Sequence, residues 1–249
     1  MNKSINHPST SSRLSITNKL HCRRCDALDR CLNAWLDRTL IRYIYPILVF
    51  RGPFKKDEAI YRKGDLVRSI FVVRSGAVKI NKTLDWGAYD VDGFYYSGDM
   101  FGLDSLDDRI QGYDAVTLEE TEICQIPLTQ FEKLSTSIPK LQQLFVSELA
   151  NQIRQKTDRL YNERHLTAEE RVRLFLKEIF ERNREQINSN NGKFPLPMTK
   201  IDIALYLGIR PESLSRILTR LQSRGVIQNS PRYIEFCNAK KLMLSITKP

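Results

Sequence analysis

The sequence predicts an α+β protein that combines an N-terminal strand-rich roll, one long helix and a small C-terminal domain of helices closed by a β-hairpin. Three observations predict this: apolar runs separated by glycines from Ala59 to Pro127, a helical period from Leu128 to Arg164, and helix-start signals before a basic segment after Thr167. The expected segments are a disordered arm at 1–20, a cysteine-rich loop at 21–37, a β-roll at 38–133, a dimerisation helix at 134–165 and a winged helix-turn-helix domain at 166–249.

The strand-rich region is expected to form a compact antiparallel roll of the jelly-roll kind. Its runs are short and rich in β-branched residues, as in SIFVVRSGAVKI at 69–80. Glycines fall between or at the ends of the runs, where turns need positive φ, at Gly64, Gly76, Gly87, Gly98 and Gly102.

The long helix is predicted to pair with a second copy of the chain. A parallel homodimer is the simplest partner for an apolar stripe on a single long helix, although the stripe could instead pack on its own strand domain. A lysine within the stripe would weaken and specify the pairing. Residues spaced alternately by three and four form this seam: Val146, Leu149, Ile153, Lys156 and Leu160.

The C-terminal region has the layout of a helix-turn-helix. Two capping-box patterns open helices, a glycine ends the second of these, and a proline fits the first turn of the next. Residues 226–236 then indicate a β-hairpin wing. The residues that carry these signals are Thr167, Glu170, Thr199, Asp202, Gly208, Pro211 and Gly225.

The helix after Pro211 is predicted to read DNA in the major groove. Arg216 can pair with guanine, Glu212 can accept from a cytosine amino group, and Ser215 can contact a neighbouring base. Further basic residues suit phosphates, which position the protein without specifying sequence: Arg220, Arg224 and Lys200. The alternative is an amphipathic helix whose solvated face is basic.

Charge supports a nucleic-acid partner. Lys and Arg number 39 against 29 Asp and Glu, a formal net charge of +10. The excess lies at the ends, since residues 167–249 hold 15 basic and 8 acidic side chains and residues 1–37 hold 6 and 3. Such segments favour an anionic partner over an acidic small substrate.

No membrane partner and no secretion signal are predicted. The longest apolar run, Tyr43–Phe50, contains Pro46 and is far shorter than the roughly 20 residues of a membrane-spanning helix. Residues 1–20 lack the apolar core of a signal peptide, so a cytoplasmic protein is expected. Cytosolic thiols stay reduced, so the five cysteines indicate metal binding or redox chemistry rather than disulfides.

Four cysteines form the candidate metal site. Three follow a C-x₂-C-x₅-C spacing, and the fourth stands about ninety residues further along a strand-like run, as Cys22, Cys25, Cys31 and Cys124. Four thiolates suit either zinc or an iron-sulfur cluster, and spacing alone does not choose between them. The alternative is four reduced, inert thiols.

Other residues near these motifs have lesser roles. Three interleaved arginines are expected to lower the thiol pKa values, and Cys237 in the wing is expected to be a small buried hydrophobe. No P-loop, nucleophile elbow or zinc-protease motif is present in the sequence, so no catalytic residue and no enzyme are predicted. The three arginines are Arg23, Arg24 and Arg30.

Together these features resemble the Crp/Fnr family of bacterial transcription regulators, and within it the oxygen-sensing fumarate-and-nitrate-reduction type. The resemblance covers nearly the full chain. It rests on the cysteine spacing and on Ile60-x₃-Gly64-Asp65, Gly98-Asp-Met-Phe-Gly102, Ala168-Glu-Glu-Arg171 and LGIRPESLSRILTRLQ at 207–222.

The resemblance implies a cyclic-nucleotide-binding-like roll and a four-iron four-sulfur cluster held by Cys22, Cys25, Cys31 and Cys124, with zinc as the second choice. It implies that the clustered dimer binds an inverted repeat of a TTGAT-like half-site in double-stranded DNA, and that oxygen loosens the dimer. By analogy, loops such as that around Gly87 would contact RNA polymerase. A zinc-stabilised regulator and a thiol redox enzyme are the alternatives.

Three departures from the family pattern qualify these expectations. Cyclic-nucleotide binders place Arg and a small hydroxyl residue where this chain has Tyr113-Asp114-Ala115, so no cyclic nucleotide is expected. Lys156 stands at a seam position where the oxygen sensor carries an acid. Charged residues flank the cysteines in place of small or apolar ones, namely Arg24, Asp26 and Arg30.

Overall fold

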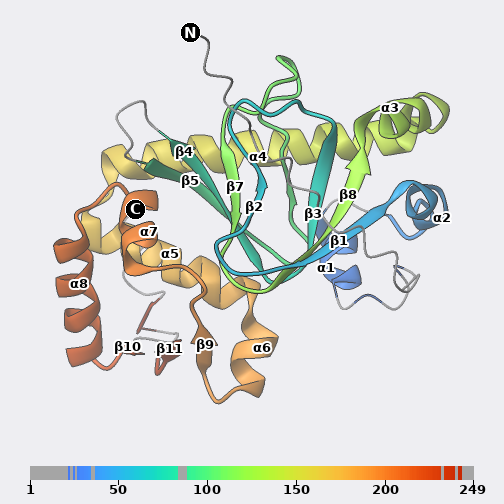
Figure 1. Cartoon of the computed structure of the whole chain (residues 1–249). Helices are drawn as coiled ribbons and strands as arrows, with labels where there is room; N and C mark the ends of the chain where they lie inside the picture. Colours follow the sequence, from blue (N-terminus) through green and yellow to red (C-terminus); the bar gives the residue numbers. More distant parts are fainter. Residues whose placement is uncertain are drawn as a thin grey trace, which may run out of the picture.

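The structure is a computed structural model, and it describes Cys22, Cys25 and residues 27–34, 37–83, 89–230, 233–238 and 241–242. The expected architecture is confirmed: a β-roll, a long helix and a C-terminal helix-turn-helix domain follow one another along the chain (Figure 1). The disordered arm predicted at 1–20 and the loop around Gly87 lie outside the described residues.

Two antiparallel four-stranded sheets form the roll, with strand orders β1-β8-β3-β6 and β2-β7-β4-β5. The central strand β3 is buried on both faces, which explains its continuous apolar run. Phe71 and Val73 point into the core between the sheets, and Ile70 and Val72 face the helices. The strands are β1 Val49–Phe54, β2 Ala59–Tyr61, β3 Ser69–Ser75, β4 Ala77–Thr83, β5 Tyr89–Tyr96, β6 Met100–Phe101, β7 Asp114–Thr117 and β8 Thr121–Pro127.

Two helices occupy the region predicted as one. Ile138 has φ −131° and ψ 88°, which are not helical, and Pro139 starts the next helix because its missing N–H costs nothing there. The dimerisation helix expected at 134–165 therefore begins at 139, and residues 134–137 belong to the preceding helix. These elements are α3 Leu128–Ser137 and α4 Pro139–His165.

The sequence predicts a loop at 21–37, but part of this segment is helical. Helix α1, Leu28–Ala34, begins soon after Cys25 and carries Cys31. A second short helix, α2 Ile41–Ile44, and a 3₁₀ turn at Tyr45–Ile47 then lead into the roll.

The C-terminal domain confirms both capping boxes. The Thr167 hydroxyl accepts from the Glu170 amide at 3.3 Å, and the Thr199 hydroxyl accepts from the Asp202 amide at 3.1 Å. A short strand before the helix-turn-helix pairs with the predicted hairpin and makes the wing three-stranded. The elements are α5 Ala168–Arg182, α6 Arg184–Ser189, β9 Lys193–Pro195, α7 Lys200–Tyr206, α8 Pro211–Ser223, β10 Ile227–Asn229 and β11 Tyr233–Phe236.

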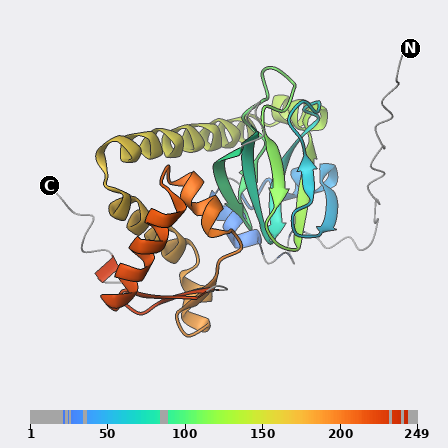
Figure 2. The same cartoon turned by 60° about the vertical axis from the view of Figure 1, so that its left-hand side comes forward.

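This domain packs on the roll, and α4 runs along both (Figure 2). Helix α7 lies against β5, where Phe94 contacts the rings of Phe175 and Tyr206. A buried ion pair joins the two parts, since Lys79 Nζ lies 2.6 Å from Asp202 Oδ1. In the part of the chain that the structure describes, no helix is both long and apolar enough to cross a bilayer.

Candidate functional site

The four cysteines of the candidate metal site line one small apolar cavity at the base of the roll. Cys22 and Cys25 precede α1, Cys31 lies on α1, and Cys124 lies in β8. The walls between them come from α2 and β3, including Ile44. The fold thus brings together thiols that are about ninety residues apart in the sequence.

Strand register explains the position of Cys124. Strand β8 lies between β1 and β3, where Cys124 stands opposite Phe50 and Val72. The two neighbouring strands fix its backbone, while α1 brings Cys31 to the same wall. Among the described residues, no group of three or more His, Cys, Asp or Glu side chains is arranged to hold a metal ion as it stands.

The cavity disfavours free thiolates. Burial, together with the neighbouring Cys25 and Cys22, raises the pKa of Cys31 to about 12. Burial is also the largest cause of the raised pKa values of Cys22 and Cys124. At Cys22 and Cys124 desolvation outweighs the lowering effect of Arg74. The lowering expected from the arginines interleaved with the cysteines stays a prediction. Arg23 and Arg24 lie outside the described residues.

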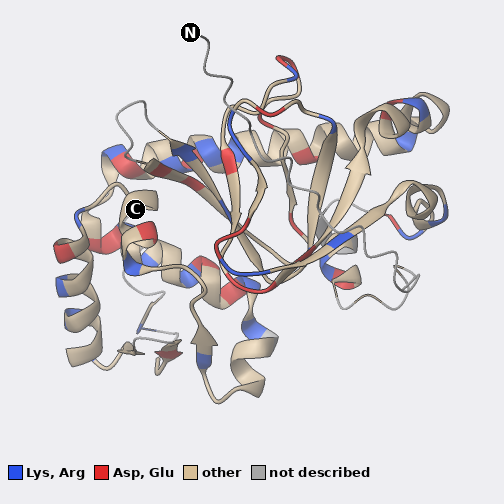
Figure 3. Ribbon diagram, viewed as in Figure 1, with Lys and Arg blue, Asp and Glu red and all other residues tan. Residues whose placement is uncertain are grey.

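Helix α8 presents the predicted base-reading residues to solvent. Glu212, Ser215 and Arg216 are exposed on its N-terminal half. The opposite face is buried in the domain core and fixes the rotation of the helix, through Leu214, Ile217, Leu218 and Leu221. Basic residues recur along α8 (Figure 3).

The predicted phosphate contacts have different surroundings. Lys200 is exposed at the first position of α7. Arg220 Nη1 lies 2.7 Å from Glu169 Oε2, and Arg224 Nη1 lies 2.9 Å from Glu169 Oε1. Sequence inspection missed Glu169 because it is about fifty residues from its partners. It lies in the first turn of α5 and ties that helix to α8.

The predicted seam divides between two faces of α4. Val146, Ile153 and Leu160 are exposed, with exposed fractions of 56%, 66% and 52%. Leu149 instead packs on the roll, and Lys156 Nζ lies 2.8 Å from Asp92 Oδ2 of β5. The exposed apolar residues therefore recur every seven residues, and the two seam residues between them turn toward their own subunit.

Cys237 does not behave as expected. It was predicted to be a buried hydrophobe, but it is exposed just after β11. The wing strand buries Ile234 and Phe236, so the next residue leaves the core.

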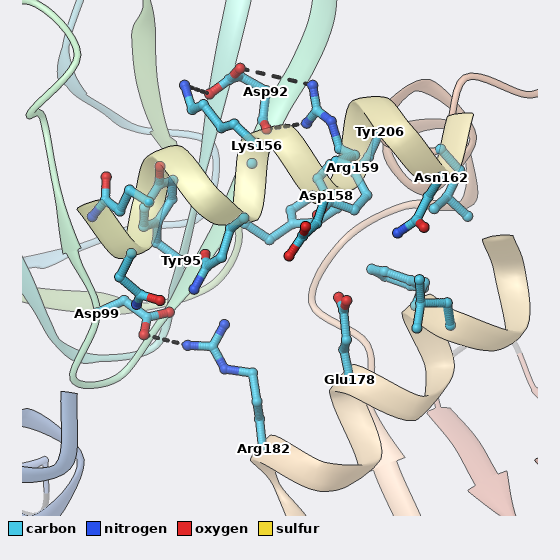
Figure 4. Close-up of a pocket in the computed structure, with 18 of the residues that line it drawn as sticks. Asp92, Tyr95, Asp99, Lys156, Asp158, Arg159, Asn162, Glu178, Arg182 and Tyr206 are labelled. Atoms are coloured by element: carbon cyan, nitrogen blue, oxygen red, sulfur yellow. Dashed lines mark hydrogen bonds and ion pairs between the residues drawn. The ribbon is translucent and has the colours of Figure 1, made fainter. Parts of the chain in front are cut away.

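A second cavity of about 500 Å³, with many charged side chains in its lining, lies between β5, α4 and α5 (Figure 4). Its charges pair across elements: Asp92 with Lys156 and Arg159, and Asp99 with Arg182. Sequence inspection missed this cavity because its walls come from segments far apart in the chain.

Comparisons with known proteins agree with this geometry. Residues 51–137 match the cyclic nucleotide-binding domain family, and residues 170–244 match the Crp-like helix-turn-helix domain family. The chain is 30% identical to the transcriptional activator protein FnrA of Stutzerimonas stutzeri, over 88% of this chain and 90% of the relative.

Two further proteins extend the likeness. The fumarate and nitrate reduction regulatory protein of Vibrio cholerae is 29% identical over 90% of this chain and 89% of its own length. The structure of FixK2 from Bradyrhizobium japonicum superposes with a TM-score of 0.71 at 27% identity, covering 79% of this chain and 96% of FixK2.

These likenesses cover both the roll and the DNA-binding domain. The relatives are regulators, so the alternative of a thiol redox enzyme is wrong and the chain is not an enzyme. The chain belongs to the Crp/Fnr family and is a DNA-binding transcriptional regulator.

Proposed function

We propose that this regulator senses oxygen or redox state through a four-iron four-sulfur cluster, which controls dimerisation and binding to a palindromic operator. The observation that carries the proposal is the convergence of Cys22, Cys25, Cys31 and Cys124 on one apolar cavity. Anaerobic regulation also agrees with the name of the Vibrio cholerae relative, which refers to fumarate and nitrate reduction.

The residues present fit such a group in donor type and number. Four thiolates are the usual ligands of a cubane cluster, and the cavity otherwise consists of apolar side chains and Arg74. Bound there, the cluster would supply oxygen-labile iron-sulfur bonds. The positive charge of the iron would keep the thiols ionised despite their burial, and Ile44 and Val72 would limit the access of water.

Helix α4 supplies the proposed dimer contact. Val146, Ile153 and Leu160 leave an apolar stripe exposed on a 27-residue helix, and a parallel second copy would cover it. Leu149 and Lys156 would flank this stripe from the side of the roll. Lys156 would bring a positive charge from each subunit close to the seam.

Helix α8 supplies the proposed operator contacts. Glu212, Ser215 and Arg216 would read a TTGAT-like half-site, and a two-fold dimer would read an inverted repeat. Lys200, Arg220 and Arg224 would contact phosphates, and the two arginines would do so while still paired with Glu169. Contacts to RNA polymerase would come from loops of the roll.

Cyclic nucleotides are not expected as effectors. Asp114 offers a carboxylate near the roll turn where nucleotide binders offer Arg and a hydroxyl, and its oxygens accept from the Lys63 amide and the Thr83 hydroxyl. A phosphate would meet repulsion there.

The test is anaerobic purification of the full chain. We expect about four iron and four sulfide per subunit, visible absorbance that fades when air enters, and weaker operator binding afterwards. A colourless protein without iron and sulfide under strict anaerobiosis would remove the cluster from the proposal. Zinc that is retained in air, with air-insensitive operator binding, would support the zinc-stabilised alternative.

A further inference from the structure

We propose that Asp99 is a positioning residue that transmits the state of the cysteine site to the DNA-binding domain within one subunit, through its ion pair with Arg182. The inference rests on the proposed function, because it assigns a route to the regulation of the same cysteine site. Dimerisation is the first route by which the cysteine site would control DNA binding, and this ion pair would be a second.

The first contact in this route joins helix α1 to the turn between β5 and β6. Gly98 has φ +93°, and a Cβ at this position would stand 2.5 Å from Cβ of Arg30 and 3.2 Å from the amide nitrogen of Cys31. Such distances leave no room for any side chain, so the glycine backbone lies directly against α1. A shift of the helix that carries Cys31 therefore changes the surroundings of this turn.

The turn is also fixed to the wall of the cysteine cavity. The Gly98 amide donates to the Val73 carbonyl at 2.8 Å, and the Val73 amide donates to the Asp99 carbonyl at 3.0 Å. Val73 lines the cavity together with Cys124, which stands opposite its neighbour Val72. The turn and the cavity wall thus form one hydrogen-bonded unit.

The side chain of Asp99 reaches the DNA-binding domain. One carboxylate oxygen accepts from the Tyr96 amide at 2.8 Å, and the other pairs with Nη2 of Arg182, the last residue of α5 (Figure 4). The Asp99 side chain is 18% exposed, and the guanidinium of Arg182 also lies over the Tyr96 ring. The carboxylate end of the pair is therefore largely shielded from water, while the guanidinium of Arg182 is half exposed.

Helix α5 continues the route to the recognition helix. Glu169 at its first turn pairs with Arg220 of α8 and with Arg224, the residue that follows α8, so both ends of α5 are held by ion pairs. A rigid helix between two fixed ends moves as a unit, and a displacement at Arg182 therefore reaches α8.

The size of the cysteine cavity gives a reason for α1 to move. The cavity measures about 30 Å³, which is room for one or two water molecules. An eight-atom cluster is larger than one or two water molecules, so holding it would require part of the wall to move. Because Cys124 is fixed between two strands, helix α1 is the wall that can shift, and it is the wall that contacts Gly98.

The test uses Arg182→Gln in the full chain, with Lys177→Gln as the matched control. Lys177 lies on the same helix, but its described ion pair is with Glu181 and not with the roll. Each protein is prepared metal-free and loaded anaerobically with ferrous iron and sulfide. The measurements are iron and sulfide per subunit, the dimer dissociation constant, and the Kd for an inverted-repeat duplex at equal dimer concentration.

We expect loading with iron and sulfide to tighten operator binding of the wild-type dimer. The coupling ratio is the Kd of the metal-free protein divided by the Kd of the loaded protein. In Arg182→Gln this ratio should be about 5- to 10-fold smaller than in the wild type, which is within the usual range of allosteric coupling. Iron content and dimer dissociation should stay at wild-type values. Lys177→Gln should keep the full ratio. Asp99→Asn, which retains the shape of the side chain, should reproduce Arg182→Gln.

Amide hydrogen exchange gives a readout that is independent of DNA. Loading should slow exchange at the C-terminal end of α5 in the wild type, and this response should be absent in Arg182→Gln. If Arg182→Gln keeps both the wild-type ratio of metal-free to loaded Kd and the wild-type exchange response, this inference is wrong, but the proposed function is unaffected. Wild-type protein without iron and sulfide would overturn the proposed function and this inference together.

Discussion

The cysteine site and the recognition helix of this chain are built in opposite ways. Every base-reading candidate on α8 lies within one 13-residue helix, whose buried face fixes its rotation. The cysteine site takes its thiols from the segment before α1, from α1 itself and from β8. The first site depends on local order, whereas the second depends on the packing of the roll. Substitutions should therefore separate sensing from DNA reading.

The largest effect is expected at the cysteine site. Cys124→Ser removes the one candidate ligand that lies within a β-sheet, between β1 and β3. We therefore expect near-complete loss of iron and sulfide and a fall in operator affinity on the order of 100-fold. Cys237→Ser is the control, because Cys237 is exposed at the wing. Metal analysis and operator titration under anaerobic conditions would check this, and a Cys124→Ser protein with full iron content would contradict it.

The contact between the roll and the DNA-binding domain, made by Lys79 and Asp202, should respond to pH. Burial by itself would raise the pKa of Asp202, but hydrogen bonds from Lys79 and Thr199 outweigh it and lower the pKa. A lowered pKa contributes stability that is present above the unfolded value and is lost on acidification, here below about pH 4.

Asp202→Asn should therefore lower the free energy of unfolding by about 3 kcal/mol at pH 7, because it leaves Lys79 buried without its partner. The difference from wild type should shrink as the pH falls through this range. Denaturant unfolding at several pH values measures both effects, with the exposed Asp107→Asn as control. A constant difference from pH 7 to pH 2 would contradict the assignment.

A charge in the exposed stripe of α4 should weaken the dimer and so separate cluster binding from operator binding. Ile153→Glu puts a charge at the centre of the stripe, and we expect the dimer to weaken by about 2–3 kcal/mol while iron content stays unchanged. Analytical ultracentrifugation measures this. Gln130→Glu adds the same charge on the exposed face of α3 and should leave the dimer intact. Wild-type dimerisation of Ile153→Glu would place the interface elsewhere.

The smallest effects are expected within α8. Arg216→Ala should cost about 1–3 kcal/mol of operator binding and relax selectivity at one base pair. Arg224→Ala should cost less, about 1 kcal/mol, and equally on operator and random duplexes, since Arg224 already pairs with Glu169. Equal losses on both duplexes for Arg216→Ala would refute its role in base reading.

Much of the C-terminal domain could be predicted because its signals are local. The hydroxyls of Thr167 and Thr199 accept from amides three residues away, and Pro211 starts a helix through its own ring geometry. Sequence inspection failed where a partner is distant. The pairing of Arg220 with Glu169, and that of Lys156 with Asp92, could not be read from either partner alone.

The sequence by itself determined the helix starts, the alternation of strands and turns, the amphipathic character of α8 and the presence of four suitable thiols. These depend on residues within about one helical turn or one strand of each other. Only the tertiary structure decided that Cys124 meets Cys31, that Leu149 turns inward while Ile153 stays exposed, and that Cys237 leaves the core. Such contacts depend on strand register and helix packing across tens of residues, which no short pattern encodes.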